Sequence, residues 1–282
     1  MTYIWGKVMS ENTDQAHAFV IAAMSNKGGP GKTSSTTNVA VALALMGKRV
    51  LVVDADQQAN ATEVLTHGKK FYAQYGPTIC DLYNSQKFDV QDVIIPARNG
   101  DEEIPGLFLI PSDPSFERVM ENSMARPHRE KILLRHLKPV ISDFDFILID
   151  CSPALNLSST NAAYLADHVI IPVDGGSFSL TGAETVLDYL NEIKEEHFTH
   201  YSLFRNEFNS SKKKMNTFLQ DELEGNVRFR DNVLTTRIRA DENIAQAQVV
   251  CKPLYFYKRG ALVLNDYRAM AKELISLKEG AH

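Results

Sequence analysis

The chain is organised around the stretch Met24-Ser-Asn-Lys-Gly-Gly-Pro-Gly-Lys-Thr-Ser34. An apolar run at 18–23 precedes it, and residues 36–45 follow it with the pattern of a helix. A strand, a glycine-rich turn, Lys-Thr and a helix together form an arrangement that binds the phosphates of a nucleotide. The glycines let successive backbone N–H groups approach the same anionic oxygens, and the helix N-terminus adds partial positive charge. The residues predicted to contact the nucleotide are Lys27, Gly28, Gly29, Pro30, Gly31, Lys32, Thr33 and Ser34.

Two lysines in this loop have different expected roles. Lys32 is expected to reach the β- and γ-phosphates, and the hydroxyl of Thr33 is expected to ligate Mg²⁺. The usual pattern, G-x-x-x-x-G-K-[ST], requires glycine at position 26, where this chain has Asn26. The loop begins instead with a second lysine, Lys27. Because its own loop already surrounds the phosphates, Lys27 is better placed to reach a nucleotide held by a second subunit.

This loop resembles the deviant Walker A motif of the ParA/MinD superfamily of dimeric ATPases. Two further motifs follow in the order of that family. The stretch Asp54-Ala-Asp-Gln-Gln-Ala-Asn-Ala-Thr62 is similar to the family's D-x-D-P-Q-x-N, with glutamine where the family has proline. The stretch Asp150-Cys-Ser-Pro153 is similar to D-x-P-P, with one proline missing. The resemblance covers nearly the whole chain from residue 18 and leaves out only the N-terminal arm and residues 66–106.

The resemblance implies a role for each acidic residue. Asp56 would orient or deprotonate the attacking water, Asp54 would support the Mg²⁺ shell, and Asp150 would hold Mg²⁺ through water. Because ligands of doubly wound folds bind at the carboxyl ends of the strands, both Asp54 and Asp56 are expected to face the nucleotide. A purely structural capping role is the alternative for these two. The predicted cofactors are ATP and Mg²⁺, with catalytic residues Lys27, Lys32 and Asp56, and metal-site residues Thr33, Asp54 and Asp150.

The alternation of apolar runs and helical patterns predicts an α/β fold, a doubly wound, mostly parallel sheet with helices on both faces. Residues 1–17 are polar and aperiodic and are expected to form an N-terminal arm, either loose or a short helix, while 18–282 are expected to form a single P-loop ATPase domain. Residues 66–106, punctuated by glycine and proline, are expected to be the least regular part. Strands are predicted at 18–23, 49–54, 107–110, 146–150, 168–173, 201–208 and 233–238. Helices are predicted at 36–45, 78–83, 158–165, 180–195, 211–223 and 264–277. Two further helical stretches are predicted after Pro111 and are broken at Pro127, the second at 128–137.

Composition limits the class of protein. A chain of 282 residues with 44% hydrophobic content can bury a large core. It has no apolar run near the ~20 residues of a membrane span, and residues 1–10 lack the features of a secretory signal. Cys80, Cys151 and Cys251 have neither disulfide nor metal spacing, so Cys151 is expected to be an inert buried thiol rather than a cluster ligand. These features favour a cytoplasmic protein without membrane insertion.

The formal net charge of −5 argues against a protein that coats nucleic acid over its whole surface, but it allows a local basic face. Residues 235–248 resemble the ParA segment in which arginines contact DNA phosphates without reading sequence. Arg237 and Arg239 fit this role, with solvated surface arginines as the alternative. Lys258-Arg259 and Arg268 are candidates to extend the basic face.

By this resemblance, the protein would pair around ATP as a homodimer, bind DNA nonspecifically on the nucleoid, and be released by hydrolysis that a ParB-like or other cargo-bound partner stimulates. The cargo would be a plasmid, a chromosome or a protein cluster. One alternative is a MinD-like, membrane-associated positioning ATPase. In the last helix, however, Lys272 and Lys278 are matched by Glu273 and Glu279, which favours core packing over membrane binding. A metabolic or electron-transfer enzyme on the same fold is a further alternative.

Overall fold

The computed structural model describes residues 17–66, 68, 76–176, 178–195 and 197–280, and these form one eight-stranded sheet with the strand order β3-β4-β2-β5-β1-β6-β7-β8. Every neighbouring pair is parallel except β3–β4, which is antiparallel. The predicted doubly wound, mostly parallel sheet is confirmed. The strands are β1 (Phe19–Ala23), β2 (Val50–Ala55), β3 (Ile95–Asn99), β4 (Glu102–Ile110), β5 (Phe146–Cys151), β6 (His168–Val173), β7 (Tyr201–Phe208) and β8 (Val233–Arg239).

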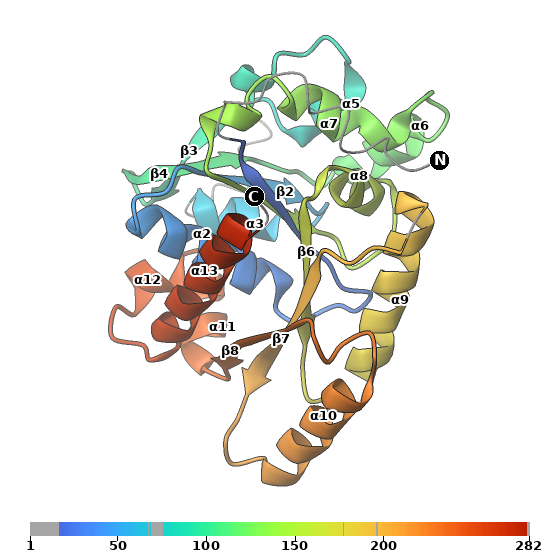
Figure 1. Cartoon of the computed structure of the whole chain (residues 1–282). Coiled ribbons are helices and arrows are strands. Elements are labelled where there is room, and N and C mark those ends of the chain that lie inside the picture. The colour runs from blue at the N-terminus through green and yellow to red at the C-terminus, as the bar shows by residue number, and fades with distance from the viewer. Residues whose placement is uncertain (1–16, 67, 69–75, 177, 196, 281–282) are drawn as a thin grey trace.

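Helices cover both faces of the sheet, as Figure 1 shows. One face packs against α2 (Lys32–Leu45), α3 (Asn60–Leu65), α11 (Glu242–Val249), α12 (Leu254–Tyr257) and α13 (Val263–Gly280). The other packs against α5 (Ile79–Asn84), α6 (Phe116–Ser123), α7 (Ile132–Leu137), α8 (Leu157–Leu165), α9 (Phe178–Lys194) and α10 (Lys213–Gly225).

The pleat of the strands explains why two cores form. Along β2, Val50 and Val52 belong to the core beneath α2 and α13, whereas Leu51 and Val53 belong to the core on the opposite face. Successive side chains of a strand point to opposite faces, so a strand buried on both sides must be apolar at every position. This requirement is why the uninterrupted apolar runs in the sequence predicted these strands.

Capping side chains begin two of the helices, and a glycine ends another. Thr78 caps α5, its hydroxyl accepting from the N–H of Cys80 while Asp81 accepts from the N–H of Thr78. Asn156 caps α8 in the same way through its side-chain oxygen. Gly47 takes a φ of 82° just after α2, the left-handed conformation of a helix end.

The region 66–106 is more regular than predicted, because β3 pairs with β4 at the edge of the sheet. Pro96 lies in this edge strand, where a missing N–H is tolerated. Strand β4 pairs with β2 only over Leu107–Ile110, the part with the apolar run, so its first half was missed. Helices α3, α11 and α12 were not predicted either.

The last helix packs on the core, as predicted. Tyr267, Met270 and Leu274 of α13 are fully buried and lie in the cluster that includes α2. Across the described residues, no helix combines the length and the apolar character that a membrane span requires. Residues 1–16 of the predicted N-terminal arm lie outside the described part of the chain.

Candidate nucleotide site

The predicted phosphate loop follows β1 at the carboxyl edge of the sheet, where the neighbouring strand β5 also ends. In the register of the parallel strands, Asp150 of β5 lies beside Ala23 of β1 on one side and Asp54 of β2 on the other. The sheet therefore brings the loop and two of the predicted acidic residues to one place, as expected for a ligand site of this class of fold.

Glycine is required in the loop for conformation and for space. Gly29 and Gly31 have φ values of 84° and 89°, which L side chains rarely adopt. A Cβ at Gly31 would collide with the side-chain amide of Asn206, which donates a hydrogen bond of 2.7 Å to the carbonyl of Pro30. Asn206 near the end of β7 thus holds the loop from a strand far away in sequence.

Lys32 lies inside the loop, as predicted. Lys32 is only 6% exposed, and its Nζ donates to the carbonyl of Lys27 at 3.4 Å. Burial lowers the pKa of Lys32 from its ordinary value, although the negative charges of Asp150 and Asp56 act in the opposite direction. This ammonium group therefore lies within the electrostatic influence of both acidic residues.

Asp150 carries the strongest sign of a missing ligand. It is fully buried, and neither carboxylate oxygen has a hydrogen-bond partner within the described part of the chain. Burial, and then the charge of Asp54, raise the pKa of Asp150 to about 8, while nearby Thr33 and Lys32 act to lower it. A buried polar group without a partner is costly, and carboxylate and hydroxyl oxygens suit Mg²⁺.

No group of three or more histidine, cysteine, aspartate or glutamate side chains in the described ranges could hold a metal ion alone. Mg²⁺ usually keeps several waters and is bound by one or two carboxylates together with substrate phosphates. Asp150 and Thr33 therefore fit a Mg²⁺ ion that arrives with a nucleotide.

Asp54 is differently engaged. Its Oδ2 accepts from the backbone N–H and the hydroxyl of Thr62, both at 2.7 Å, and Oδ1 accepts from the N–H of Asp56 at 3.2 Å. Burial raises its pKa to about 7. These contacts fix the turn between β2 and α3, which matches the capping alternative. Support of a Mg²⁺ shell by Asp54 stays a prediction.

Asp56 has a freer carboxylate. Its Oδ1 accepts from the N–H of Gln58 at 3.0 Å, and Oδ2 has no partner among the described residues. Asp56 is near enough to Asp150 to influence its pKa, so it lies at the same edge of the sheet. This placement is compatible with the predicted role in orienting water, which the structure does not test.

The side chain of Lys27 pairs with an acidic residue outside the phosphate loop. Its Nζ lies 3.0 Å from Oδ2 of Asp174, which follows β6, and 40% of the lysine side chain is exposed. Burial would raise the pKa of Asp174, but hydrogen bonds from the N–H of Gly176 and from Lys27 hold that pKa below its ordinary value. This partial exposure is compatible with a contact to another subunit, and that role stays a prediction.

Comparisons with known proteins agree with this geometry. A family model described as an AAA domain matches residues 18–203. The chromosome partitioning protein ParA of Caulobacter vibrioides is 30% identical over 272 residues, which cover 91% of this chain and 94% of that protein. The chain belongs to the ParA family of P-loop ATPases.

Solved structures show how widely this fold is used. A putative plasmid partition protein from Borrelia burgdorferi bound to AMPPNP matches with a TM-score of 0.75 and 21% identity, covering 92% of this chain and 99% of that one. Cobyrinic acid a,c-diamide synthase from Mycobacterium smegmatis matches with a TM-score of 0.76 and 20% identity, covering 94% and 97%. At such identities these matches show the shared fold alone.

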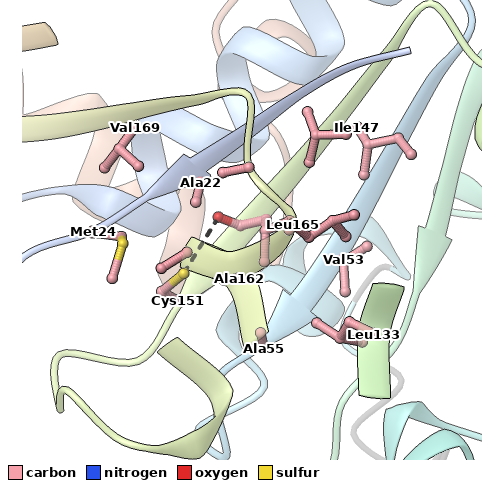
Figure 2. Packing of buried hydrophobic residues seen from close by; sticks show 14 of the residues in the cluster. Ala22, Met24, Val53, Ala55, Leu133, Ile147, Cys151, Ala162, Leu165 and Val169 are labelled. Carbon is pink, nitrogen blue, oxygen red and sulfur yellow. Dashed lines mark hydrogen bonds between the residues drawn. The ribbon is translucent and has the colours of Figure 1, made fainter. Parts of the chain in front are cut away.

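Cys151 has the surroundings of an inert thiol. It is 1% exposed and lies among apolar side chains, including Ala22, Met24 and Ala162 (Figure 2). Its Sγ lies 3.9 Å from the carbonyl of Ile149, and burial raises the pKa of the thiol far above its ordinary value. All three cysteines are free. These observations support the expectation of a buried structural thiol in this ParA-family chain.

The two arginines predicted to bind DNA differ in the structure. Arg239 forms a bidentate ion pair with Asp266, with Nε–Oδ2 and Nη2–Oδ1 both 2.7 Å, so its guanidinium is already engaged. Arg237 is exposed and lies over the ring of Phe208, 5.3 Å from its centroid. No ion pair of Arg237 occurs within the described part of the chain.

The sequence analysis did not identify a third arginine that lies in the last two strands of the sheet, next to Arg237. Arg205 of β7 lies directly beside Arg237 of β8 in the parallel register and is 4% exposed. Its hydrogen-bond acceptors are neutral groups of Asn216 and Gln220, and Nε has no partner in the described residues. Burial, and then the charge of Arg237, lower the pKa of Arg205. The signal in the sequence was an arginine directly after the apolar pair Leu203-Phe204 in a predicted strand.

Proposed function

We propose that this protein binds ATP with Mg²⁺, pairs as a dimer in that state, binds DNA nonspecifically, and moves or segregates a cargo. The observation that carries the proposal is the buried Asp150, whose oxygens have no partner in the described residues, beside a phosphate loop that contains Lys32. Membership of the ParA family supports an ATPase, and the named relatives include chromosome and plasmid partition proteins.

Each residue at the site has a defined task. The loop's N–H groups and Lys32 bind the β- and γ-phosphates, while Thr33 and Asp150 hold the metal. When bound, Mg²⁺ neutralises the charge that develops on the phosphoryl oxygens. Asp56 orients the attacking water through its free Oδ2. Phosphoryl transfer depends mainly on such positioning and charge neutralisation.

Dimerisation is proposed from the placement of Lys27. Its ammonium group is paired with Asp174 outside the loop, and 40% of the side chain is exposed, so we expect it to be available to a second subunit's nucleotide. The contact with Asp174 would have to be exchanged for a contact with phosphate. A partly exposed ion pair contributes about 0–1 kcal/mol, so the exchange costs little.

The arginine pair supports DNA binding. Like charges on directly neighbouring strand positions destabilise a sheet, and charged groups are seldom fully buried without a counter-charge. Arg205 and Arg237 are such neighbours, and Arg205, at 4% exposed, is also buried; no carboxylate of the described residues forms an ion pair with either. A DNA phosphate would supply the missing negative charge. The exposed lysines Lys212, Lys213 and Lys214 begin α10, which supplies neutral acceptors to Arg205.

The proposal also includes an activating partner protein and a cellular location. A ParB-like or other cargo-bound protein would stimulate hydrolysis, and the ATP-bound dimer would reside on the nucleoid in the cytoplasm. A MinD-like role at the membrane is a second candidate. The packing of Tyr267, Met270 and Leu274 into the core argues against α13 as a membrane anchor.

Sedimentation velocity tests the nucleotide dependence of pairing. With ATP and Mg²⁺ the protein should sediment as a dimer, and with ADP and Mg²⁺, or without nucleotide, as a monomer. A monomer in all three conditions would contradict the proposal. Binding to liposomes only with ATP would favour the membrane candidate instead.

A further inference from the structure

Helix α10 lies at the periphery of the molecule, beyond β7 (Figure 1). One side of the helix packs on the body of the protein through Leu219 and Leu223, which are buried. The opposite side is exposed at five positions that share one helical face, Lys214, Met215, Phe218, Asp221 and Glu222. We call these five residues the α10 face.

The centre of the α10 face is apolar and open to solvent. Met215 is 44% exposed and Phe218 is 53% exposed. Because the two residues are three positions apart, they lie on adjacent turns of one helix face and form a contiguous apolar surface. Removing such a surface from water is favourable, and methionine and aromatic residues are enriched in protein–protein interfaces.

The charges on either side of this apolar centre oppose the helix dipole. Lys214 lies in the first turn, which contains no acidic residue, and Asp221 and Glu222 lie toward the last turn, which contains no basic residue. A helix is stabilised by the reverse order, with negative charge near its N-terminus and positive charge near its C-terminus. None of the three charged residues forms an ion pair within the described part of the chain. The order of charges therefore does not stabilise α10 in the single chain.

We propose that the α10 face packs antiparallel against the same face of a second copy of this chain. Lys214 and Asp221 lie on opposite sides of Phe218 and at nearly equal separations from it in sequence. A two-fold axis beside Phe218 therefore brings Lys214 of each copy opposite Asp221 of the other. Met215 and Phe218 of both copies are then buried between two pairs of opposite charges. Such self-complementarity is the property of a two-fold interface.

The contact forms part of the ATP-dependent dimer of the proposed function, on which this inference rests. Two packed helices alone bury less than the roughly 1,200–2,000 Å² of a stable interface, so the contact needs a larger surface around it. A Cβ at Gly175 would lie 3.2 Å from Cγ of Met215, and Gly175 directly follows Asp174, the partner of Lys27. The α10 face therefore adjoins the surface from which Lys27 is expected to reach the second subunit.

Reversal of charge at two positions tests this pairing. In a homodimer, Lys214→Glu and Asp221→Lys each place like charges opposite one another at both contacts, so each should weaken ATP-dependent dimerisation by roughly three- to tenfold. Both substitutions agree better with the helix dipole than the native residues do, so α10 should remain folded. An equimolar mixture of the two variants has opposite charges at both contacts of the heterodimer and should dimerise as the wild-type protein does. Sedimentation velocity with ATP and Mg²⁺ measures each dimer.

Phe218→Ala should also weaken the dimer, because it removes the apolar centre of the contact. Leu262→Ala, at an exposed position just before α13, is the matched control and should leave the dimer unchanged. ATP binding verifies that each variant is folded, because the phosphate loop contains no residue of α10.

Unchanged dimerisation of both charge variants would overturn the proposal, as would a mixture that dimerises no better than either variant alone. Loss of DNA binding with an unchanged dimer would also overturn it, because Lys214 would then be a contact for DNA. A wild-type protein that stays monomeric with ATP would contradict the proposed dimer together with this contact. A wild-type dimer that the variants do not alter would contradict this contact alone.

Discussion

Lys27 and Asp174 form an ion pair 3.0 Å long that joins the phosphate loop to the turn after β6. The contact uses the ammonium group that we expect to act on the nucleotide of a second subunit. Pairing of two subunits should therefore replace one negative partner, the carboxylate of Asp174, with another, the phosphates. This relationship makes the role of Lys27 separable from that of Lys32.

Lys27→Ala should leave ATP affinity unchanged and abolish the ATP-dependent dimer, because the mutation removes only the group that acts between subunits. Asp174→Asn is the matched variant, since it frees Lys27 without removing it. It should still dimerise, at an ATP concentration lowered by less than about tenfold, because a partly exposed pair contributes about 0–1 kcal/mol. Fluorescent nucleotide titration and light scattering measure the two properties. A normal ATP dimer of Lys27→Ala would remove the reason for this assignment.

Asp54→Ala should mainly affect stability. The change leaves the N–H and hydroxyl of Thr62 buried without their acceptor, which costs about 1–3 kcal/mol. Urea unfolding without nucleotide measures this loss, and Mg²⁺-dependent ATP binding of the folded fraction should persist. If stability were unchanged while Mg²⁺ dependence was lost, Asp54 would be a metal-site residue and not a structural one.

Asp56→Ala should slow hydrolysis by about 10²–10⁴-fold, the usual contribution of one general-base group. ATP and Mg²⁺ binding should remain, because Lys32, Thr33 and Asp150 are unaltered, and the dimer should persist in its ATP state. Single-turnover phosphate release tests this outcome. Near-normal turnover would assign the orientation of water to another residue.

His168 should make stability depend on pH. Burial lowers its pKa to about 4, whereas an imidazole in the unfolded chain titrates near 6.5. Below pH 6.5 the unfolded state therefore binds more protons, so stability present at pH 7 falls as the pH falls through the window from 6.5 to 4. Between pH 7 and 5 the loss is about 2 kcal/mol. His168→Gln should reduce the pH dependence of urea unfolding by that amount, and an unchanged dependence would contradict the account.

Much of the fold could be predicted because buried parallel strands require continuous apolar runs. Strands β6 and β7 occupy the ranges predicted for them, and the phosphate loop connects β1 to α2 as its motif indicated. The edge strand β3 could not be predicted in this way. It is only partly buried and contains Pro96, so neither hydrophobicity nor propensity identifies it.

The parts of the site that were missed depend on contacts between distant segments. Asn206, Asp174 and Arg205 come to the phosphate loop or to Arg237 only through the register of β6, β7 and β8. That register is a property of the assembled sheet. Local patterns identified Lys32 and Asp150 because each belongs to a motif contiguous in sequence.

The two arginines first considered for DNA contact should contribute unequally to DNA binding. Arg237→Ala should weaken binding to all DNA alike and lower the log–log salt slope by about 0.9 for each lost phosphate contact. Arg239→Ala should have the smaller effect on DNA, because its guanidinium is held by Asp266. It should instead destabilise the contact between β8 and α13. Equal losses of DNA affinity in both variants would contradict this distinction.

The most direct test of the proposed function is the binding of wild-type protein to two unrelated DNA duplexes at ~50 mM salt, where phosphate contacts are strongest. Fluorescence anisotropy should show binding with ATP and Mg²⁺, equal affinity for both duplexes, and little binding with ADP. With a formal net charge of −5, the protein has no bulk attraction for DNA, so such binding must come from a local basic site. Absence of binding with ATP at this salt would contradict the account.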